Sequence, residues 1–212
     1  MTDTAQRALE QLRNPGMFEW HIVFFLMVLW YVYAVEIGRG RWDVVAAGLA
    51  VWLADWINEI LNSFVLAWTG VHALWIETGP TAYQLLVGLN IETTMLFLLF
   101  GVVYAKLLPA DRNARIAGMN GRWFWAVNLS VAAVVTELVL NRWGVLNWHW
   151  WFWDVPWGIP LIFAFGYLWF FMAAAWAHDA TSEAQRWRRI GTLAGRRGRA
   201  RSDWRRRRLA LT

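Results

Sequence analysis

The sequence predicts an all-α integral membrane protein in which five transmembrane helices form one bundle. Hydrophobic residues make up 58% of the 212-residue chain, which is more than a soluble domain of this size needs. They gather in runs of about 20 residues, the length that an α-helix needs to cross a bilayer and about twice the length of a membrane β-strand. Basic loops alternate with loops that are nearly free of Lys and Arg, as expected of a polytopic protein.

Each predicted span is an apolar run that ends at a polar or charged segment. The first follows a polar arm, residues 1–16, that lacks the features of a cleaved signal peptide. The second and third are separated by residues 71–80, which are too short and mixed to cross the membrane. An Arg-rich tail, residues 179–212, follows the fifth. The five predicted spans are residues 17–37, 44–68, 83–107, 123–140 and 157–178.

Positive charge orients the predicted spans. Arg39 and Arg41 follow the first span, Arg112 and Arg115 follow the third, and eleven Arg lie in the tail. The loop after the second span has no Lys or Arg, and the loop after the fourth has only Arg142. The rule places the N-terminus outside and the C-terminus in the cytoplasm. We expect a multi-pass protein of a cell membrane, specifically a bacterial inner membrane.

The tail interleaves its Arg residues with Trp187 and Trp204. Such a segment binds anionic lipid headgroups, with a gain of about 1 kcal/mol for each basic residue near the surface. Arg-rich tails also bind nucleic-acid phosphates. The membrane surface is the favoured partner, because this tail directly follows a predicted span.

Four polar residues interrupt the second predicted span. Asp55, Asn58, Glu59 and Asn62 fall within an arc of about 100° when each residue turns the helix by about 100°. A charged side chain at the centre of a bilayer costs at least about 2.5–3.5 kcal/mol. The stripe is therefore expected to face protein or water rather than lipid.

Other predicted spans supply partners for this stripe. Glu137 lies in the outer half of the fourth span, and Asn90 and Glu92 lie in the outer half of the third. Glu92 falls on roughly the opposite side of its helix from Asn90. Either that helix is enclosed on two sides, or Glu92 meets another subunit or the membrane interface. Together these acids predict a pocket that opens outward or sideways into the outer leaflet.

A Trp-rich segment, residues 141–160, is predicted to roof this pocket. It holds six Trp, and Pro156, Gly158 and Pro160 interrupt it. An aromatic belt at the membrane surface explains most of these Trp residues, but it explains their density in this segment less well. His149 and Trp151 would then contact a ligand from the roof.

The sequence excludes several kinds of chemistry. The chain has no Cys, which rules out thiolate nucleophiles, disulfides and Cys-ligated metals. It also lacks the HExxH, P-loop and GxSxG motifs. We predict no cofactor and no metal; a carboxylate metal site is conceivable from the acids, but no ligand spacing supports it.

Acids beside indole rings suit proton-initiated chemistry on alkenes. A buried carboxyl group donates protons near neutral pH, and indole faces stabilise a developing cation. Two short segments, "NIETTMLFLLF" and "VPWGIPLIFAFGYLWFF", resemble the sterol isomerases of the emopamil-binding kind and the membrane terpene cyclases in this general style. We predict Glu59 as the proton donor with Asp55 and Glu92 as its support. The predicted ligand-binding residues are Trp52, Trp56, Asn58, Asn62, Asn90, Glu137, His149 and Trp151.

The predicted ligand is a membrane lipid or another hydrophobic small molecule, isomerised or cyclised if it is isoprenoid or sterol-like. Two other functions stay open. A proton-coupled transporter would use Asp55 and Glu59 as a relay, most naturally in a homo-oligomer because the chain has no internal repeat. An accessory subunit of a membrane complex would pair its acids with cations of its partner.

Overall fold

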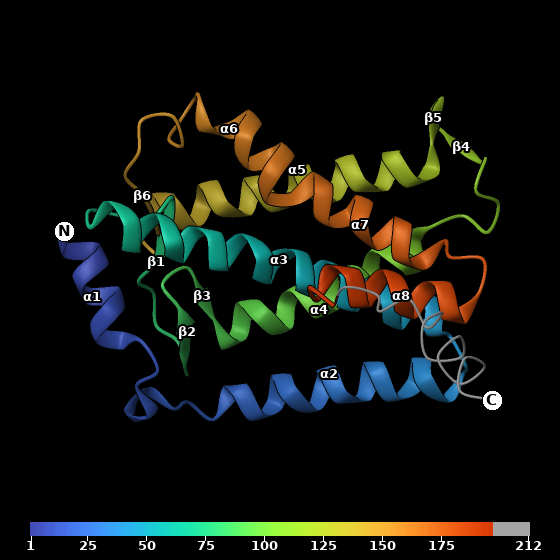
Figure 1. The fold of residues 1–212 in the computed structure, drawn as a ribbon, viewed down its shortest axis with the longest axis horizontal. Coiled ribbons are helices and arrows are strands. Elements are labelled where there is room, and N and C mark those ends of the chain that lie inside the picture. The colour runs from blue at the N-terminus through green and yellow to red at the C-terminus, as the bar shows by residue number, and fades with distance from the viewer. Residues whose placement is uncertain (197–212) are drawn as a thin grey trace, which may run out of the picture.

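The computed structural model describes residues 1–196, and the bulk of them form a bundle of long helices (Figure 1). Helix α3 runs through the middle of the bundle and packs most extensively against α4 and α7. The last long helix is continuous but contains a π-helical segment, η2, between α6 and α7. The long elements are α2 (His21–Gly38), α3 (Trp42–Thr69), α4 (Ile91–Leu107), α5 (Gly121–Arg142), α6 (Gly158–Leu161), η2 (Ile162–Leu168) and α7 (Trp169–His178).

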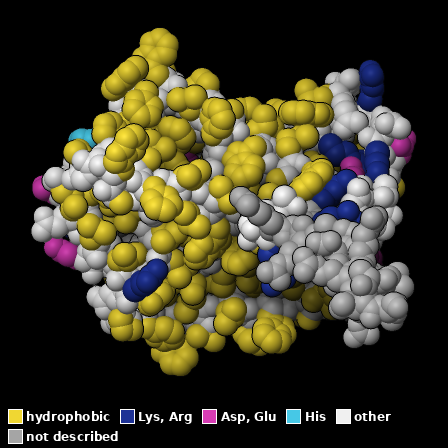
Figure 2. All heavy atoms as spheres, viewed as in Figure 1, with side chains coloured by type: hydrophobic (Ala, Val, Ile, Leu, Met, Phe, Trp, Pro, Cys, Tyr) yellow, Lys and Arg dark blue, Asp and Glu magenta, His cyan; other side chains and the backbone are white. Residues whose placement is uncertain are grey.

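Four of these helical stretches, α2, α3, α5 and the continuous stretch α6–η2–α7, are long and apolar enough to cross a membrane. Their outward faces carry large apolar side chains, such as Phe24, Trp30 and Phe64, each more than 60% exposed. Figure 2 shows hydrophobic side chains over much of one face of the bundle. Lipid is the solvent that accommodates an apolar surface of this extent.

The third predicted span begins too early in the sequence. Residues 83–90 are not helical; they include strands β2 (Gln84–Leu86) and β3 (Leu89–Asn90), which pair with each other. Helix α4 starts only at Ile91, because the Asn90 side chain accepts a hydrogen bond from the Thr93 backbone N–H at 2.7 Å and so caps the helix. At 17 residues α4 is the shortest of the five long helical stretches, and five transmembrane helices remain a prediction.

The end of the bundle that carries α1 (Asp3–Gln11), β1 (Trp75–Glu77), β2, β3 and β6 (Leu146–Trp148) is called the cap end here. Strands β1 and β6 pair antiparallel, with Trp75 opposite Trp148. The predicted polar arm contains helix α1, which buries Ala5 and Ala8 against the cap and is followed by a short 3-10 turn, η1 (Pro15–Met17). Pairing between distant segments thus gives structure to residues that the sequence placed in loops.

The opposite end, called the tail end, carries the hairpin β4 (Arg115–Ile116) and β5 (Met119–Asn120) and helix α8 (Glu183–Leu193). Helix α8 packs against α3, and its Ile190 and Leu193 contact the main core. The first part of the predicted tail therefore lies against the bundle. The rest of the predicted headgroup-binding segment, from residue 197, lies outside the described residues.

A partly buried ion pair links α5 to the C-terminal side of α7. Arg122, 6% exposed, donates from Nε and Nη2 to the two carboxylate oxygens of Asp179 at 3.1 Å each. Its Nη1 donates to the backbone oxygens of Pro109 and Asp111. Burial acts to raise the pKa of Asp179, but the hydrogen bonds from Arg122 and His178 outweigh it and hold that pKa below its ordinary value. This network fixes the loop between α4 and α5 against the end of α7.

The orientation of the bundle is a testable prediction. The alternating basic loops place the cap end outside and the tail end in the cytoplasm. A reporter that is active only in the cytoplasm should give signal when fused after residue 212, and none when fused to the N-terminus. The reverse pattern would move the cap end to the cytoplasmic side.

Candidate functional site

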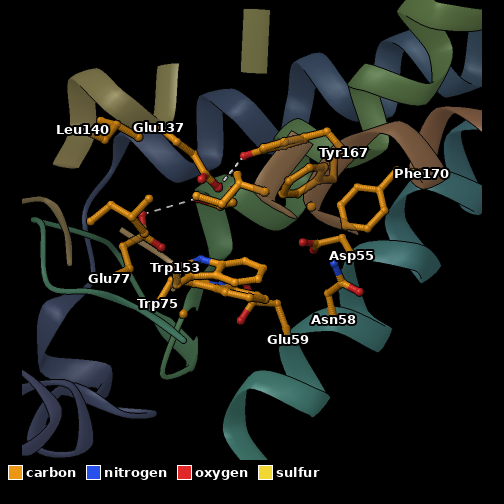
Figure 3. Close-up of a pocket in the computed structure, with 16 residues that line it drawn as sticks. Asp55, Asn58, Glu59, Trp75, Glu77, Glu137, Leu140, Trp153, Tyr167 and Phe170 are labelled. Atoms are coloured by element: carbon orange, nitrogen blue, oxygen red, sulfur yellow. Dashed lines mark hydrogen bonds between the residues drawn. The ribbon is translucent and has the colours of Figure 1, made fainter. Parts of the chain in front are cut away.

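A cavity of about 80 Å³ lies inside the bundle near the cap end, and four carboxyl side chains reach it (Figure 3). Asp55 and Glu59 come from α3, Glu137 from α5, and Glu77 from strand β1. Two helices and one cap strand thus bring their acids to one place. Among the lining residues there is no Lys, Arg or His.

Three residues of the polar stripe of α3, Asp55, Asn58 and Glu59, line this cavity. Asp55 and Glu59 are 3% and 4% exposed and lie one helical turn apart. Asn62, fully buried, accepts hydrogen bonds from the backbone N–H groups of Leu74 (2.8 Å) and Trp75 (3.2 Å) and donates to the Trp75 backbone oxygen (2.8 Å). It therefore fixes the cap segment that carries Trp75. Asn58 donates to the backbone oxygen of Phe165 at 2.7 Å, which ties α3 to η2.

Two stacked indole rings form the aromatic wall. Trp75 donates from its ring nitrogen to Glu59 Oε1 at 2.7 Å. Its ring stacks on Trp153 with a centroid separation of 5.5 Å and an interplanar angle of 24°. Gly88 makes room for this arrangement, because a Cβ there would lie 2.6 Å from the Trp75 ring. The Trp-rich segment thus contributes to the cavity through Trp153.

A tyrosine anchors the acid of α5. The Tyr167 hydroxyl donates to Glu137 Oε1 at 2.6 Å (Figure 3). Tyr167 lies on the π-helical segment η2, and such wide turns inside helices often mark functional sites because they re-aim side chains. Sequence reasoning did not identify Tyr167, because a π-helical turn has no reliable sequence signature.

Glu77 is the fourth acid, and sequence reasoning missed it. It lies in the segment 71–80, which is too short to span a membrane, and the structure buries it through β1. Thr93 Oγ1 donates to Glu77 Oε1 at 3.5 Å. Burial raises the pKa of Glu77 to about 8. The available sequence signal was a lone acid beside Trp75 and Ile76.

Three fully buried carboxyl oxygens at the cavity have no hydrogen-bond partner within residues 1–196: Asp55 Oδ2, Glu59 Oε2 and Glu77 Oε2. A buried ionised oxygen without a partner costs several kcal/mol. Two carboxylates one helical turn apart also repel each other strongly in a medium of low dielectric constant. The cavity is therefore suited to a group that brings positive charge, above all a proton.

Glu92, predicted to support catalysis, lies on the other side of α4. It accepts hydrogen bonds from Thr81 Oγ1 at 2.6 Å and from the Ala82 backbone N–H at 2.8 Å, and it lies 2.8 Å from His21 Nε2. Helix α4 is thus enclosed on two sides, which was the first of the two alternatives for Glu92. Its carboxyl group joins α4 to the start of α2 and does not line the cavity.

Two predicted ligand-binding tryptophans lie away from the cavity. Both Trp52 and Trp56 donate from their ring nitrogens to Thr94 Oγ1 at 3.0 Å. They join α3 to α4 on a face that the stripe does not occupy. Asn90 caps α4, and Asn62 acts on the cavity through the backbone that it holds.

The predicted roof residues are also outside the cavity. His149 stacks on His72 with a centroid separation of 4.9 Å, and Trp151 is 76% exposed. Asn58 and Glu137, together with the predicted catalytic residues Asp55 and Glu59, do line it. Within residues 1–196, no three His, Asp or Glu side chains are arranged to hold a metal ion.

The pKa of Glu77 predicts how stability depends on pH. Between its ordinary pKa of 4.5 and its folded value of about 8, the folded protein keeps a proton that the unfolded chain has released. The free energy of unfolding contributed by this group is therefore greatest below pH 4.5 and falls as pH rises, by at most about 1.4 kcal/mol per pH unit. Above pH 8 that contribution is lost.

Glu77→Gln keeps the shape of the side chain and removes its titration. We expect the difference in unfolding free energy between the native chain and this variant to shift in favour of the variant as pH rises from 5 to 8. Denaturant titrations of both chains in one detergent, at several pH values, measure this difference in unfolding free energy. A difference that stays constant with pH would show that Glu77 does not hold a proton in the folded state.

Comparison with known sequences places the chain among membrane proteins. The sequence model of a family described as "Uncharacterized membrane protein family" matches residues 2–200. The chain belongs to this family. A relative from Archaeoglobus fulgidus, described as an uncharacterized protein, is 46% identical over 178 residues, which cover 84% of each chain. No solved structure matches. Family membership and the apolar helices establish a membrane protein; because this relative is archaeal, the bacterial inner membrane stays a prediction.

Proposed function

We propose that the protein is an intramembrane acid–base catalyst that protonates the reactive end of a lipid-soluble small molecule. Isomerisation or cyclisation of an isoprenoid or sterol-like lipid is the reaction that suits the site. The observation that carries this proposal is the cavity itself, where four carboxyl groups meet two stacked indoles without any basic lining residue.

Glu59 is the proton donor in this proposal. Trp75 holds Oε1, so the unpartnered Oε2 is the atom that carries the transferable proton. Addition of this proton to an alkene carbon leaves a cation on the neighbouring carbon, and the indole faces of Trp75 and Trp153 stabilise that charge. Asp55 then removes a proton from an adjacent carbon, which forms the shifted double bond. A proton returned from Asp55 to Glu59 restores the site, so the reaction consumes none.

The size of the cavity restricts what enters it. Sites that enclose a whole drug-sized ligand measure about 300–1,000 Å³, against about 80 Å³ here. Only the reactive end of a lipid fits, and the rest of the molecule must lie in the bilayer. The junction of α3 and η2 is the route, because Asn58 and Gly166 line the cavity there and the neighbouring Phe165 is 62% exposed.

Proton-coupled transport is the second candidate, and the same small volume favours it. A cavity of about 80 Å³ has room for a few water molecules, each needing at least about 10–15 Å³ of such volume. Water beside several carboxyl groups is a suitable environment for passing protons. The accessory-subunit alternative requires a partner that places a Lys or Arg against these acids.

Deuterium labelling separates these functions. The purified protein is reconstituted in liposomes with a lipid extract of the host and incubated in deuterated water. An acid–base isomerase or cyclase places deuterium on carbon in one lipid class, which mass spectrometry detects. Flux of protons along a pH gradient, measured with a trapped pH-sensitive dye and without labelled lipid, would instead support transport.

A further inference from the structure

A second hollow, at the tail end, has chemistry opposite to that of the acidic cavity. This groove has a volume of about 540 Å³ and lies between the loop that precedes β4, helix α5, helix α7 and helix α8. Its polar lining includes Arg112, Asn120, Arg122 and Arg189, against one acid, Asp179. The lining therefore has a formal charge of +2, whereas the charged residues that line the cavity at the cap end are all acids.

Two of the three Arg residues have side-chain N–H groups without an acceptor within residues 1–196. Arg122 directs Nε, Nη1 and Nη2 to Asp179 and two backbone oxygens. The Arg112 guanidinium is half exposed, and its Nε lies 3.8 Å from Asp179, beyond hydrogen-bond distance. Arg189 donates from Nη1 to the Trp176 backbone oxygen, and its guanidinium lies over the Trp176 ring at 5.0 Å from the centroid. No acceptor within residues 1–196 takes the remaining side-chain N–H groups of Arg112 and Arg189.

The rest of the groove is apolar. Met172 and Ala175 of α7 line it together with the rings of Trp123 and Trp176. These two Trp side chains are 46% and 41% exposed, as is common for Trp at the boundary between hydrocarbon and headgroups. Figure 2 shows Lys and Arg side chains gathered at the tail end beside a hydrophobic surface. An occupant must therefore satisfy both guanidinium groups and apolar side chains.

We propose that this groove binds the phosphate headgroup of an anionic phospholipid. The phosphate accepts hydrogen bonds from those N–H groups of Arg112 and Arg189 that have no acceptor within residues 1–196, because guanidinium matches the geometry of phosphate oxygens. The glycerol and the start of the acyl chains lie against Met172, Trp123 and Trp176. A free phosphate ion would leave this apolar surface unused, which is why a lipid is the occupant. The site is independent of the proposed chemistry at the cap end.

The test measures lipid binding by the full chain in an uncharged detergent. Short-chain phosphatidylglycerol is titrated while thermal unfolding or native mass spectra report occupancy. The groove variant is Arg112→Gln/Arg189→Gln. The matched control is Arg115→Gln/Arg188→Gln, which removes the same charge from the adjoining strand β4 and from the same helix α8, at exposed side chains outside the groove. We expect at least about tenfold weaker binding for the groove variant and nearly native binding for the control.

Three results would overturn the proposal. Equal losses in the groove and control variants would mean that charge acts diffusely and not through a site. Equal affinity for phosphatidylcholine, which has no net charge, would exclude recognition of an anionic headgroup. Inorganic phosphate that protects as well as the lipid at the same concentration would identify a free-anion site. If the double variant does not fold, Arg112→Gln alone, which alters a half-exposed side chain, is compared with Arg115→Gln by the same criteria.

Discussion

Glu59→Gln is expected to abolish labelling of lipid in deuterated water, with a loss of at least about 100-fold in rate. The amide has nearly the shape of the carboxyl group and still accepts the hydrogen bond from Trp75, so the cavity stays formed. Its amide protons are far too weakly acidic to be transferred to an alkene. Lipid retained during purification should be the same as for the native chain, because the change removes a reactant and not a contact.

Glu36→Gln is the control for this prediction. Glu36 is also a buried carboxyl group in a predicted span, 3% exposed, but its partner is Lys106 near the tail end. The variant Glu36→Gln should leave the rate of lipid labelling unchanged once equal amounts of folded protein are compared. Undiminished labelling in Glu59→Gln would remove Glu59 from the mechanism. Loss of a co-purifying partner from Glu59→Gln, with no effect on lipid, would favour the accessory-subunit function.

Arg122→Gln should have the largest effect on stability, a loss of about 1.5–3 kcal/mol in the free energy of unfolding, because Asp179 keeps its contact with His178 and part of its exposure to solvent. The change leaves Asp179 facing an amide where it now has two charge-assisted hydrogen bonds, and the oxygens of Pro109 and Asp111 lose their donor. Titration with a denaturing detergent, followed by circular dichroism, measures the loss.

Arg115→Gln is the matched control for Arg122→Gln, because its side chain is exposed and such changes usually stay within about 0.5 kcal/mol. A double-mutant cycle with Asp179→Asn isolates the pair. If Arg122→Gln costs no more than Arg115→Gln, the ion pair does not hold the tail end together.

The helical part of the site could be predicted from the sequence because a helix places its side chains at a fixed angle. That regularity brought Asp55, Asn58 and Glu59 to one face and put Glu92 on the other side of its helix from Asn90. The same arithmetic turns Trp56 away from the Asp55 side of α3. Trp56 was predicted as a ligand contact because it follows Asp55 in sequence, and proximity along a helix is not proximity in space.

The remainder of the site depends on contacts between distant segments, which no local pattern encodes. Glu77 reaches the cavity because β1 pairs with β6 and because Asn62 and Val87 hold the same segment. The apolar composition of residues 83–90 suited a span as well as a short hairpin, and the Asn90 cap decided where α4 begins. Tyr167 depends on the wide turns of η2.

The pairing of β1 with β6 also determines the order in which segments fold during synthesis. Chains are synthesised from the N-terminus, so α3 with its acids is complete long before Leu146–Trp148 exists to pair with Trp75–Glu77. Contacts of such long sequence separation form late and slow a fold. During that interval Asp55 and Glu59 lack the walls supplied by Trp153 and Tyr167. Until then, the acids of α3 stay in contact with water or with the membrane-insertion machinery. The cavity closes off from solvent only when the continuous stretch α6–η2–α7 packs against α3.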